Sequence, residues 1–301
     1  MTGRSFPARL AALALALLLA GCGTYNPLRW MGIISEPANK PTPLTPISAT
    51  VTPKAAWTAS VGKAAGFWFQ PDAEGGNVYA TGADGRLEVI EEATGRVSAR
   101  HDLRKKLSSG VKVADGKAIV GTLKGEVLAI DSAGKQAWSA DVQGEVIAPA
   151  AVSNRTVVVR TADGRIFGLA LADGKRQWVY QRQAPALLLR SPAGVIAAGN
   201  DVVAGFPNGK LIALDLEDGK LVWEVTVATP RGTTDLERIA DIGGLPLIDS
   251  GRLCAAAFQG KVACYDIQSR NAVWSRDLSS SSALVADAKN VYVVDDSGAV
   301  H

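Results

Sequence analysis

A repeated motif constrains the fold of this 301-residue chain more than any other feature of its sequence. Each copy has a turn with glycine, an alternating apolar segment, a second polar turn and then an aromatic position. The turn glycine precedes the aromatic position by 13 or 14 residues in every copy. The copies span residues 84–99, 124–138, 163–178, 208–223 and 259–274, and Ala99 replaces tryptophan in the first. A fixed period of this kind indicates a chain built from stacked structural repeats.

Each repeat predicts a group of short antiparallel strands. Runs of Val, Ile, Leu and Ala bounded by Gly and Asp turns are typical of hairpins, and no helical periodicity is present. The turn glycines recur every 38 to 51 residues, which is the size of a four-stranded propeller blade. One blade cannot cover its own apolar face, so the blades must stack around an axis with the tryptophans packed between them. The predicted fold is all-β, a β-propeller of four-stranded antiparallel blades.

Two consecutive repeats are longer than the others. The turn glycines Gly164 and Gly209 are 45 residues apart, and the next interval, to Gly260, is 51. Extra residues in a repeat protein map to loops, and adjacent loops can share a face. The segments 181–192 and 230–244 are therefore the candidate binding surface.

The first long segment combines three leucines with an arginine between prolines, which suits an interface anchor for a charged partner. Alternation predicts that Leu187 and Leu189 share one face beside Arg190. The alternative is that the leucines, Leu188 above all, form a blade strand. In the second segment, a threonine at 233 or 234 followed by Glu237 predicts a short capped helix.

The N-terminus carries an export signal. Two basic residues precede an apolar run over 10–20, which is too short to span a bilayer stably, and Leu19-Ala20-Gly21-Cys22 follows. This resembles a bacterial lipoprotein signal and its lipobox, and the alternative is an ordinary secretory signal with a chance cysteine. We predict a signal peptide over 1–21, lipidation of Cys22, an extended proline-rich tether over 22–52 and the propeller over 53–301. Gly23, where aspartate would mark retention, implies the outer membrane.

Two further cysteines, Cys254 and Cys264, flank a predicted hairpin turn at Gln259-Gly260. In an oxidising compartment they are either a cross-strand disulfide or two buried free thiols.

The repeat resembles the pyrroloquinoline-quinone-type propeller repeat, whose Asp-Gly-Lys-x-x-Trp segment is present at 173–178 and 218–223. That name describes a structural repeat, and we expect no cofactor. The repeat, the lipobox and the segment 231–242 together resemble those of the BamB family. Members of this family are lipoproteins of the outer-membrane β-barrel assembly machinery (the BAM complex).

The family resemblance implies a non-enzymatic scaffold. The resemblance further implies that this scaffold docks on the periplasmic POTRA repeats of BamA, beside other BAM subunits, and aids insertion of outer-membrane proteins. The resemblance assigns partner contacts to Leu187, Leu189, Arg190, Arg238 and Asp241. Gly243 stands where the family has a second acidic residue.

The resemblance also implies eight blades in the full protein, whereas this sequence stops just past a turn glycine, Gly298. Trp57 has the outer-strand pattern with no blade before it, as expected of a strand that closes the last blade of a propeller. We therefore expect a C-terminally truncated, incomplete ring.

Two other classes of protein share the repeat. A quinoprotein dehydrogenase would use metal ligands, but the chain has only two histidines, no adjacent cysteine pair and no compact carboxylate cluster, so we predict no metal site. An independent ligand-binding lipoprotein shares every fold-level feature and differs only in its loops. The net charge of +3 includes Arg4 and Arg9 of the signal, so the mature chain is nearly neutral and nucleic-acid binding is not expected.

Overall fold

The computed structural model describes residues 43–183, 185 and 187–301. The chain divides into two units, residues 1–43 and 44–301, and the account below concerns the second. The predicted signal peptide, the lipidation residue Cys22 and most of the predicted tether lie outside the described residues. No helix within the described part of the chain is long and apolar enough to cross a bilayer.

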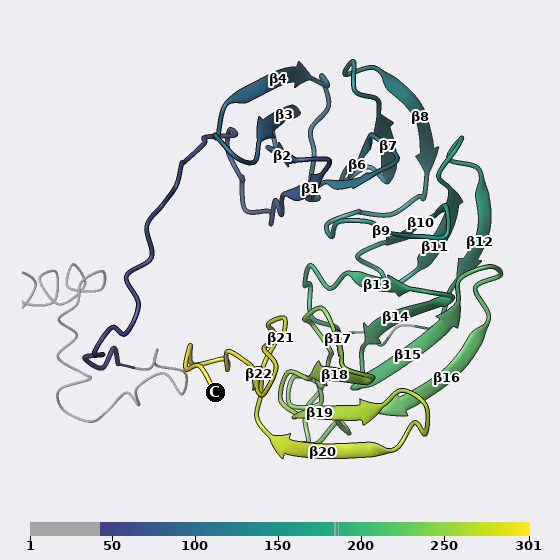
Figure 1. Ribbon diagram of the computed structural model, residues 1–301. Coiled ribbons are helices and arrows are strands. Elements are labelled where there is room, and N and C mark those ends of the chain that lie inside the picture. Colours follow the sequence, from purple (N-terminus) through teal and green to yellow (C-terminus); the bar gives the residue numbers. More distant parts are fainter. Residues whose placement is uncertain (1–42, 184, 186) are drawn as a thin grey trace, which may run out of the picture. The chain divides into compact units, whose positions relative to one another are not determined.

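Five four-stranded antiparallel sheets succeed one another in chain order (Figure 1). In each, four consecutive strands pair with their sequence neighbours, as expected of propeller blades. The first sheet is β1 (Asp72–Glu74), β2 (Asn77–Thr81), β3 (Arg86–Glu91) and β4 (Val97–Asp102). The second is β5 (Lys112–Ala114), β6 (Lys117–Gly121), β7 (Glu126–Ile130) and β8 (Gln136–Asp141). The third is β9 (Ala151–Ser153), β10 (Thr156–Arg160), β11 (Ile166–Ala170) and β12 (Arg176–Tyr180).

The remaining strands continue the pattern. The fourth sheet is β13 (Val195–Ala198), β14 (Asp201–Phe206), β15 (Lys210–Asp215) and β16 (Leu221–Thr226). The fifth is β17 (Leu247–Asp249), β18 (Arg252–Ala256), β19 (Lys261–Asp266) and β20 (Ala272–Asp277). A two-stranded sheet of β21 (Val285–Ala286) and β22 (Val291–Tyr292) follows. The described residues contain no helix, so the all-β prediction is confirmed.

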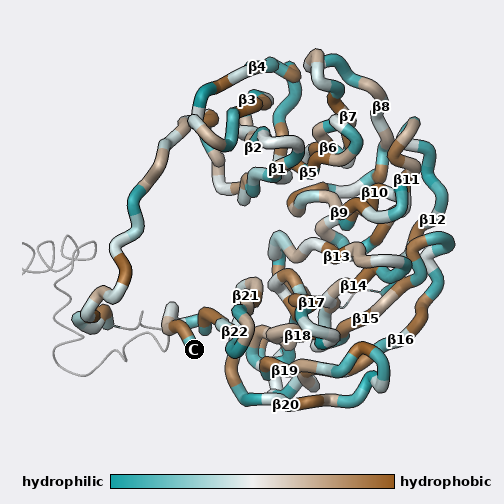
Figure 2. The backbone as a smooth tube through the Cα atoms, viewed as in Figure 1, coloured by the Kyte–Doolittle hydropathy of each residue, from teal (hydrophilic) through white to brown (hydrophobic). Residues whose placement is uncertain are grey.

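The hydrophobic core lies between neighbouring sheets. Successive residues of a central strand point to opposite faces. In β10, Val157 and Val159 pack against the preceding sheet, whereas Val158 packs against the following one. From the second sheet to the fifth, the second and third strands are therefore buried on both faces, and Figure 2 shows their hydrophobic stretches. No sheet could be removed without exposing the apolar face of its neighbours.

Two tryptophans of the repeat, Trp138 and Trp178, join their blades to the next. Trp138 of the second sheet donates its indole N–H to the carbonyl of Leu171 in the third, at 2.9 Å. A Cβ at Gly174, in the Asp-Gly-Lys turn of that third sheet, would lie 2.5 Å from the ring. Trp178 repeats the contact on Gly219 of the fourth sheet. The Asp-Gly-Lys-x-x-Trp motif at 173–178 thus takes part in two inter-blade contacts: its glycine packs against the tryptophan of the preceding blade, and its tryptophan packs against a glycine of the following blade.

Trp57 makes the same contact although no strand lies around it. Its indole N–H donates to the carbonyl of Glu92 at 2.8 Å, and its ring covers Gly95 in the first sheet. Residues 53–61 form no strand in the structure. Trp57 therefore occupies the position of a tryptophan from a preceding blade, as its sequence pattern predicts, but the strand expected around it is not formed.

Cys254 and Cys264 are directly opposite each other in β18 and β19 and form a disulfide. Both are buried in the cluster that joins the fifth sheet to β21 and β22.

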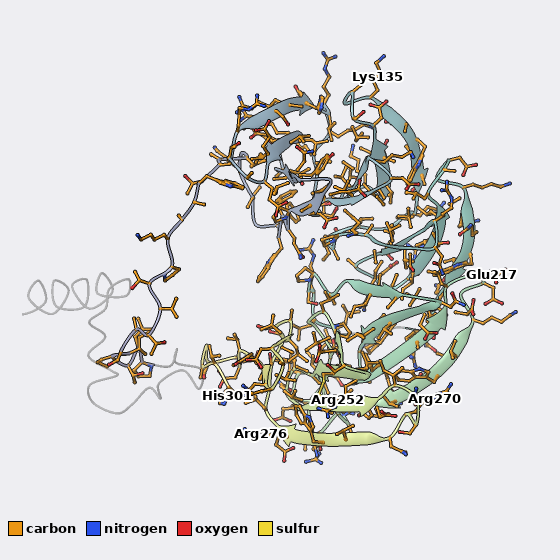
Figure 3. All side chains as sticks on the ribbon, in the orientation of Figure 1. Lys135, Glu217, Arg252, Arg270, Arg276 and His301 are labelled. Carbon is orange, nitrogen blue, oxygen red and sulfur yellow. A yellow bond between two sulfur atoms is a disulfide. The ribbon has the colours of Figure 1, made fainter. Side chains whose placement is uncertain are left out.

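The turns between the third and fourth strands are solvent-exposed and polar. Lys135, Glu217 and Arg270 occupy three of them and point outward (Figure 3). The two long loops leave the sheets at the other end of these strands.

Candidate interaction surface

Hydrogen bonds tie the two long loops together. The first connects β12 to β13 over residues 181–194, and the second connects β16 to β17 over residues 227–246. The backbone N–H of Leu189 donates to Oδ2 of Asp241 at 2.7 Å, and the Ser191 hydroxyl donates to the carbonyl of Gly243 at 2.6 Å. The prediction that the two insertions share a face is therefore confirmed.

Asp241 is at the centre of this connection. Only 5% of the residue is exposed, and its other oxygen accepts the backbone N–H of Asn208 at 3.2 Å. One carboxylate thereby holds the β12–β13 loop and the β14–β15 turn in place. The role expected for Asp241 was partner contact, and the structure places its carboxylate inside the protein, where it positions Leu189. At Gly243, a Cβ would meet Ser191 at ordinary contact distance.

The three leucines of the first loop belong to no strand, because β13 begins only at Val195. The alternative that they form a blade strand is therefore wrong. The alternation argument also fails, since Leu188 and Leu189 line one pocket and Leu187 does not. Leu187 is 45% exposed and leaves apolar surface that a partner could cover.

Arg190 is exposed and bound to an exposed partner. Its Nη2 lies 2.9 Å from Oε2 of Glu145, which comes from the loop before β9. The side chains are 60% and 45% exposed, and ion pairs of this kind contribute at most about 1 kcal/mol. A carboxylate on a partner could therefore displace Glu145 at little cost.

The second loop contains a capped turn where a short helix was predicted. The carboxylate of Glu237 accepts the backbone N–H groups of Thr233 and Thr234, at 2.8 and 3.0 Å, and these bonds lower its pKa to about 2. The N–H of Arg238 donates to the carbonyl of Thr234, which closes one turn, and no helix follows. The helix prediction is wrong because the capping bonds form without a second turn to extend them.

Arg238 is exposed and folds back over this turn. Its guanidinium donates to the carbonyls of Thr233 and Thr234 and lies 3.5 Å from Asp235. It lies apart from the leucine loop's pocket, so the structure does not bring it together with Arg190.

A pocket lies beneath the first loop, and its floor is an aromatic ring flanked by two arginines. The guanidinium carbons of Arg160 and Arg182 lie 4.8 and 5.5 Å from the ring centroid of Phe206. Burial lowers the pKa of Arg160 to about 10, and the nearby charge of Asp241 opposes the shift. The polar and charged residues of the lining are Arg160, Thr161, Asp163, Arg182, Gln183, Ser191, Asn208, Lys210 and Asp241.

Sequence reasoning missed Arg160 and Glu145. Arg160 ends an apolar run of three valines in β10, and a charge at the end of such a strand is a weak signal of a polar site. Glu145 lies 45 residues from Arg190, and nothing in the local pattern connects them.

Comparison with known proteins agrees with this fold. A family model described as outer membrane protein assembly factor BamB matches residues 83–301. The BamB of Nitrosomonas eutropha is 39% identical over 295 residues, covering 96% of this chain and 72% of that protein. The BamB of Burkholderia pseudomallei is 38% identical over 294 residues, covering 97% of this chain and 75% of that protein.

Solved structures show the same architecture. The crystal structure of BamB from Moraxella catarrhalis is similar with a TM-score of 0.70 and 27% identity, covering 74% of this chain and 68% of that one. A quinohemoprotein alcohol dehydrogenase from Comamonas testosteroni is similar with a TM-score of 0.53 and 16% identity, covering 74% of this chain and 43% of that one. At 16% identity the second likeness shows the fold alone.

The stacked sheets and the glycine–tryptophan contacts define a β-propeller of the pyrroloquinoline-quinone-type repeat. Both the family model, over more than half of the chain, and relatives more than 30% identical point to one group within that class. The chain belongs to the BamB family of outer membrane protein assembly factors. Members of this family are named for assembly and not for catalysis, so the chain is a non-enzymatic member of a fold that enzymes also use.

Proposed function

We propose that this protein is a scaffold subunit of the outer-membrane β-barrel assembly machinery, and that its two joined loops dock on the periplasmic POTRA repeats of BamA. Leu187 would bury its exposed apolar surface, and Arg190 would exchange Glu145 for a carboxylate of the partner. Other subunits of the BAM complex would be held near BamA by the same scaffold.

One observation carries the proposal. Two insertions from consecutive blades are held together by a buried carboxylate, and an apolar and a basic side chain remain exposed beside that connection. Fixed loops lose little conformational entropy on binding, so a small number of exposed anchors is enough to supply affinity. The turn around Glu237 is preorganised in the same way, with Arg238 on its surface.

We further propose that the propeller is anchored to the outer membrane through acyl chains on Cys22 and faces the periplasm. The proposal rests on the lipobox ending at Cys22 and on the glycine that follows it. Two or more acyl chains hold a protein at a membrane far more firmly than one chain does. Metabolic labelling with radioactive palmitate tests this, because the label should enter the wild-type protein and be absent from Cys22→Ala.

The docking proposal is tested by co-purification from outer membranes in mild detergent. We expect BamA to accompany the tagged full-length wild-type protein, and Arg190→Glu to lose at least about 2 kcal/mol of binding free energy, since a desolvated like-charge contact replaces an attraction. Arg155→Glu is the matched control. Arg155 also forms an exposed ion pair, with Asp115, at the opposite end of its blade.

The outcomes separate the candidates. Loss of BamA with Arg190→Glu and retention with Arg155→Glu would support docking through the loops. Equal recovery in all three proteins would remove Arg190 from the contact. Absence of BamA even with wild type would favour an independent ligand-binding lipoprotein.

A further inference from the structure

Arg160 lines the pocket, and its guanidinium has an unused hydrogen-bond donor. Its Nη1 atom is buried and has no hydrogen-bond partner among the described residues. No carboxylate within the described residues forms an ion pair with it, although Asp241 is close enough to influence its charge. An arginine normally satisfies its donors when buried, so an unpaired N–H in a pocket indicates a binding site for an acceptor.

The other charged groups around the pocket are already paired. Asp163 binds Arg165, and Glu224 binds both Arg182 and Lys210 at 3.0 and 2.9 Å. Asp241 accepts two backbone N–H groups. Among the described cations of the lining, Arg160 therefore has the fewest ion pairs and hydrogen bonds to balance its charge and its donors.

The geometry also suits a ligand with one negative charge. The guanidinium carbon of Arg160 lies over the Phe206 ring, 4.8 Å from its centroid, and this attraction helps to hold the donor fork in place. The nearby carboxylates of Asp163 and Asp241 would repel a doubly charged group such as phosphate. A single carboxylate matches the donor fork of Arg160, and its one negative charge balances the uncompensated positive charge of that arginine.

We propose that this pocket binds the carboxylate of an acidic side chain on a partner protein, and that Arg160 is its principal hydrogen-bond donor. The inference rests on the proposed docking function, because the pocket is walled by Leu188 and Leu189 of the docking loop. These apolar walls and Pro185 suit a chain segment that carries the carboxylate, whereas a free small acid would leave them uncovered. The partner's acidic side chain would enter beneath the loop, while Arg190 contacts the partner outside it.

The two arginines then differ in their response to salt. The ion pair of Arg190 is exposed, so salt screens its contribution. The Arg160 pair is desolvated within the pocket and is screened much less. Removal of Arg160 should therefore weaken binding by about the same factor at low and at high ionic strength.

The test is calorimetric binding of the full-length mature protein to the purified POTRA repeats of BamA from the same organism, at 0.1 and about 0.5 M salt. We expect Arg160→Met to weaken binding by about tenfold or more at both salt concentrations. Arg155→Met, at the other end of β10, is the control and should bind within about twofold of wild type. Near-ultraviolet circular dichroism checks that the fold persists. Should Arg160→Met fail to fold, Arg160→Lys keeps the charge, loses the fork and should weaken binding several-fold.

A set of Asp→Asn and Glu→Gln variants of the POTRA repeats identifies the ligand. One of them should weaken binding to wild type but cause no further loss with Arg160→Met, which is the signature of a direct pair. A folded Arg160→Met that binds as well as wild type would overturn the pocket assignment and leave the docking proposal intact. Absence of coupling to every partner carboxylate would overturn it too. Failure of the wild type to bind at all would overturn the docking proposal and this inference with it.

Discussion

Replacing Asp241 with alanine tests whether the two loops form a single preorganised surface. The carboxylate accepts N–H groups from Leu189 and Asn208 and lies near the buried guanidinium of Arg160. Alanine leaves both donors without an acceptor and removes the negative charge beside Arg160. The β12–β13 loop should then lose its fixed position, although no residue exposed on the surface has changed.

The cost can be worked out from these contacts. A buried donor without a partner costs about 1–3 kcal/mol. Asn208 is exposed and water can satisfy its N–H, so most of the loss comes from Leu189 and from the uncompensated charge of Arg160. We expect Asp241→Ala to lower the free energy of unfolding by about 2–3 kcal/mol. The loosened loop should also weaken BamA binding, because its ordering must then occur on binding.

Urea denaturation of the full-length mature protein, followed by tryptophan fluorescence, measures the first effect, and calorimetric titration with the POTRA repeats measures the second. Asp235→Ala is the control, because Asp235 is an exposed carboxylate of the same loop, and it should change stability by less than about 0.5 kcal/mol. If Asp241→Ala unfolds and binds as wild type does, Asp241 does not hold the loops together.

Three further predictions follow from individual contacts. Glu145→Gln frees Arg190 from its exposed ion pair, so binding to the POTRA repeats should strengthen up to about fivefold in low salt, and weaker binding would contradict the exchange of partners. The pKa of Glu237 is lowered to about 2, so the stabilisation from its turn is present above pH 4.5 and is lost as the pH falls through about 2. The amide resonances of that turn should shift near pH 2, and a shift near 4.5 would show that the turn bonds are absent. Trp178→Ala removes a buried inter-blade contact and should cost about 3–5 kcal/mol in urea denaturation, whereas a loss below about 1 kcal/mol would show that the blades do not depend on it.

The blades could be predicted because their signals are local. A turn glycine, an alternating strand and an aromatic position lie within 15 residues, and the five copies correspond to the five four-stranded sheets, with tryptophan at that position in four of them. The reason for the Asp-Gly-Lys turn was not visible in the sequence, since Gly174 serves Trp138 of the preceding blade. Trp57 was recognised by its pattern, but no local signal revealed that it would dock without a strand around it.

The candidate surface was only partly predictable. Repeat lengths located both loops, because inserted residues change a fixed period. The contacts that define the surface join residues far apart in sequence, 52 positions for Leu189 and Asp241 and 45 for Arg190 and Glu145. Family resemblance gave Asp241 a partner contact, whereas its burial is decided by the packing of three segments. Proximity of this kind has no signature in a single sequence.

The most direct test of docking through the joined loops is site-specific photocross-linking in living cells. A photoreactive amino acid at Leu187, which is exposed, should give an adduct with BamA. The same residue at Asp115, in an exposed turn at the opposite end of the blades, should give none. An adduct from Leu187 alone is the result we predict. An adduct with BamA from Asp115 and none from Leu187 would show that the protein docks through the other end of its blades.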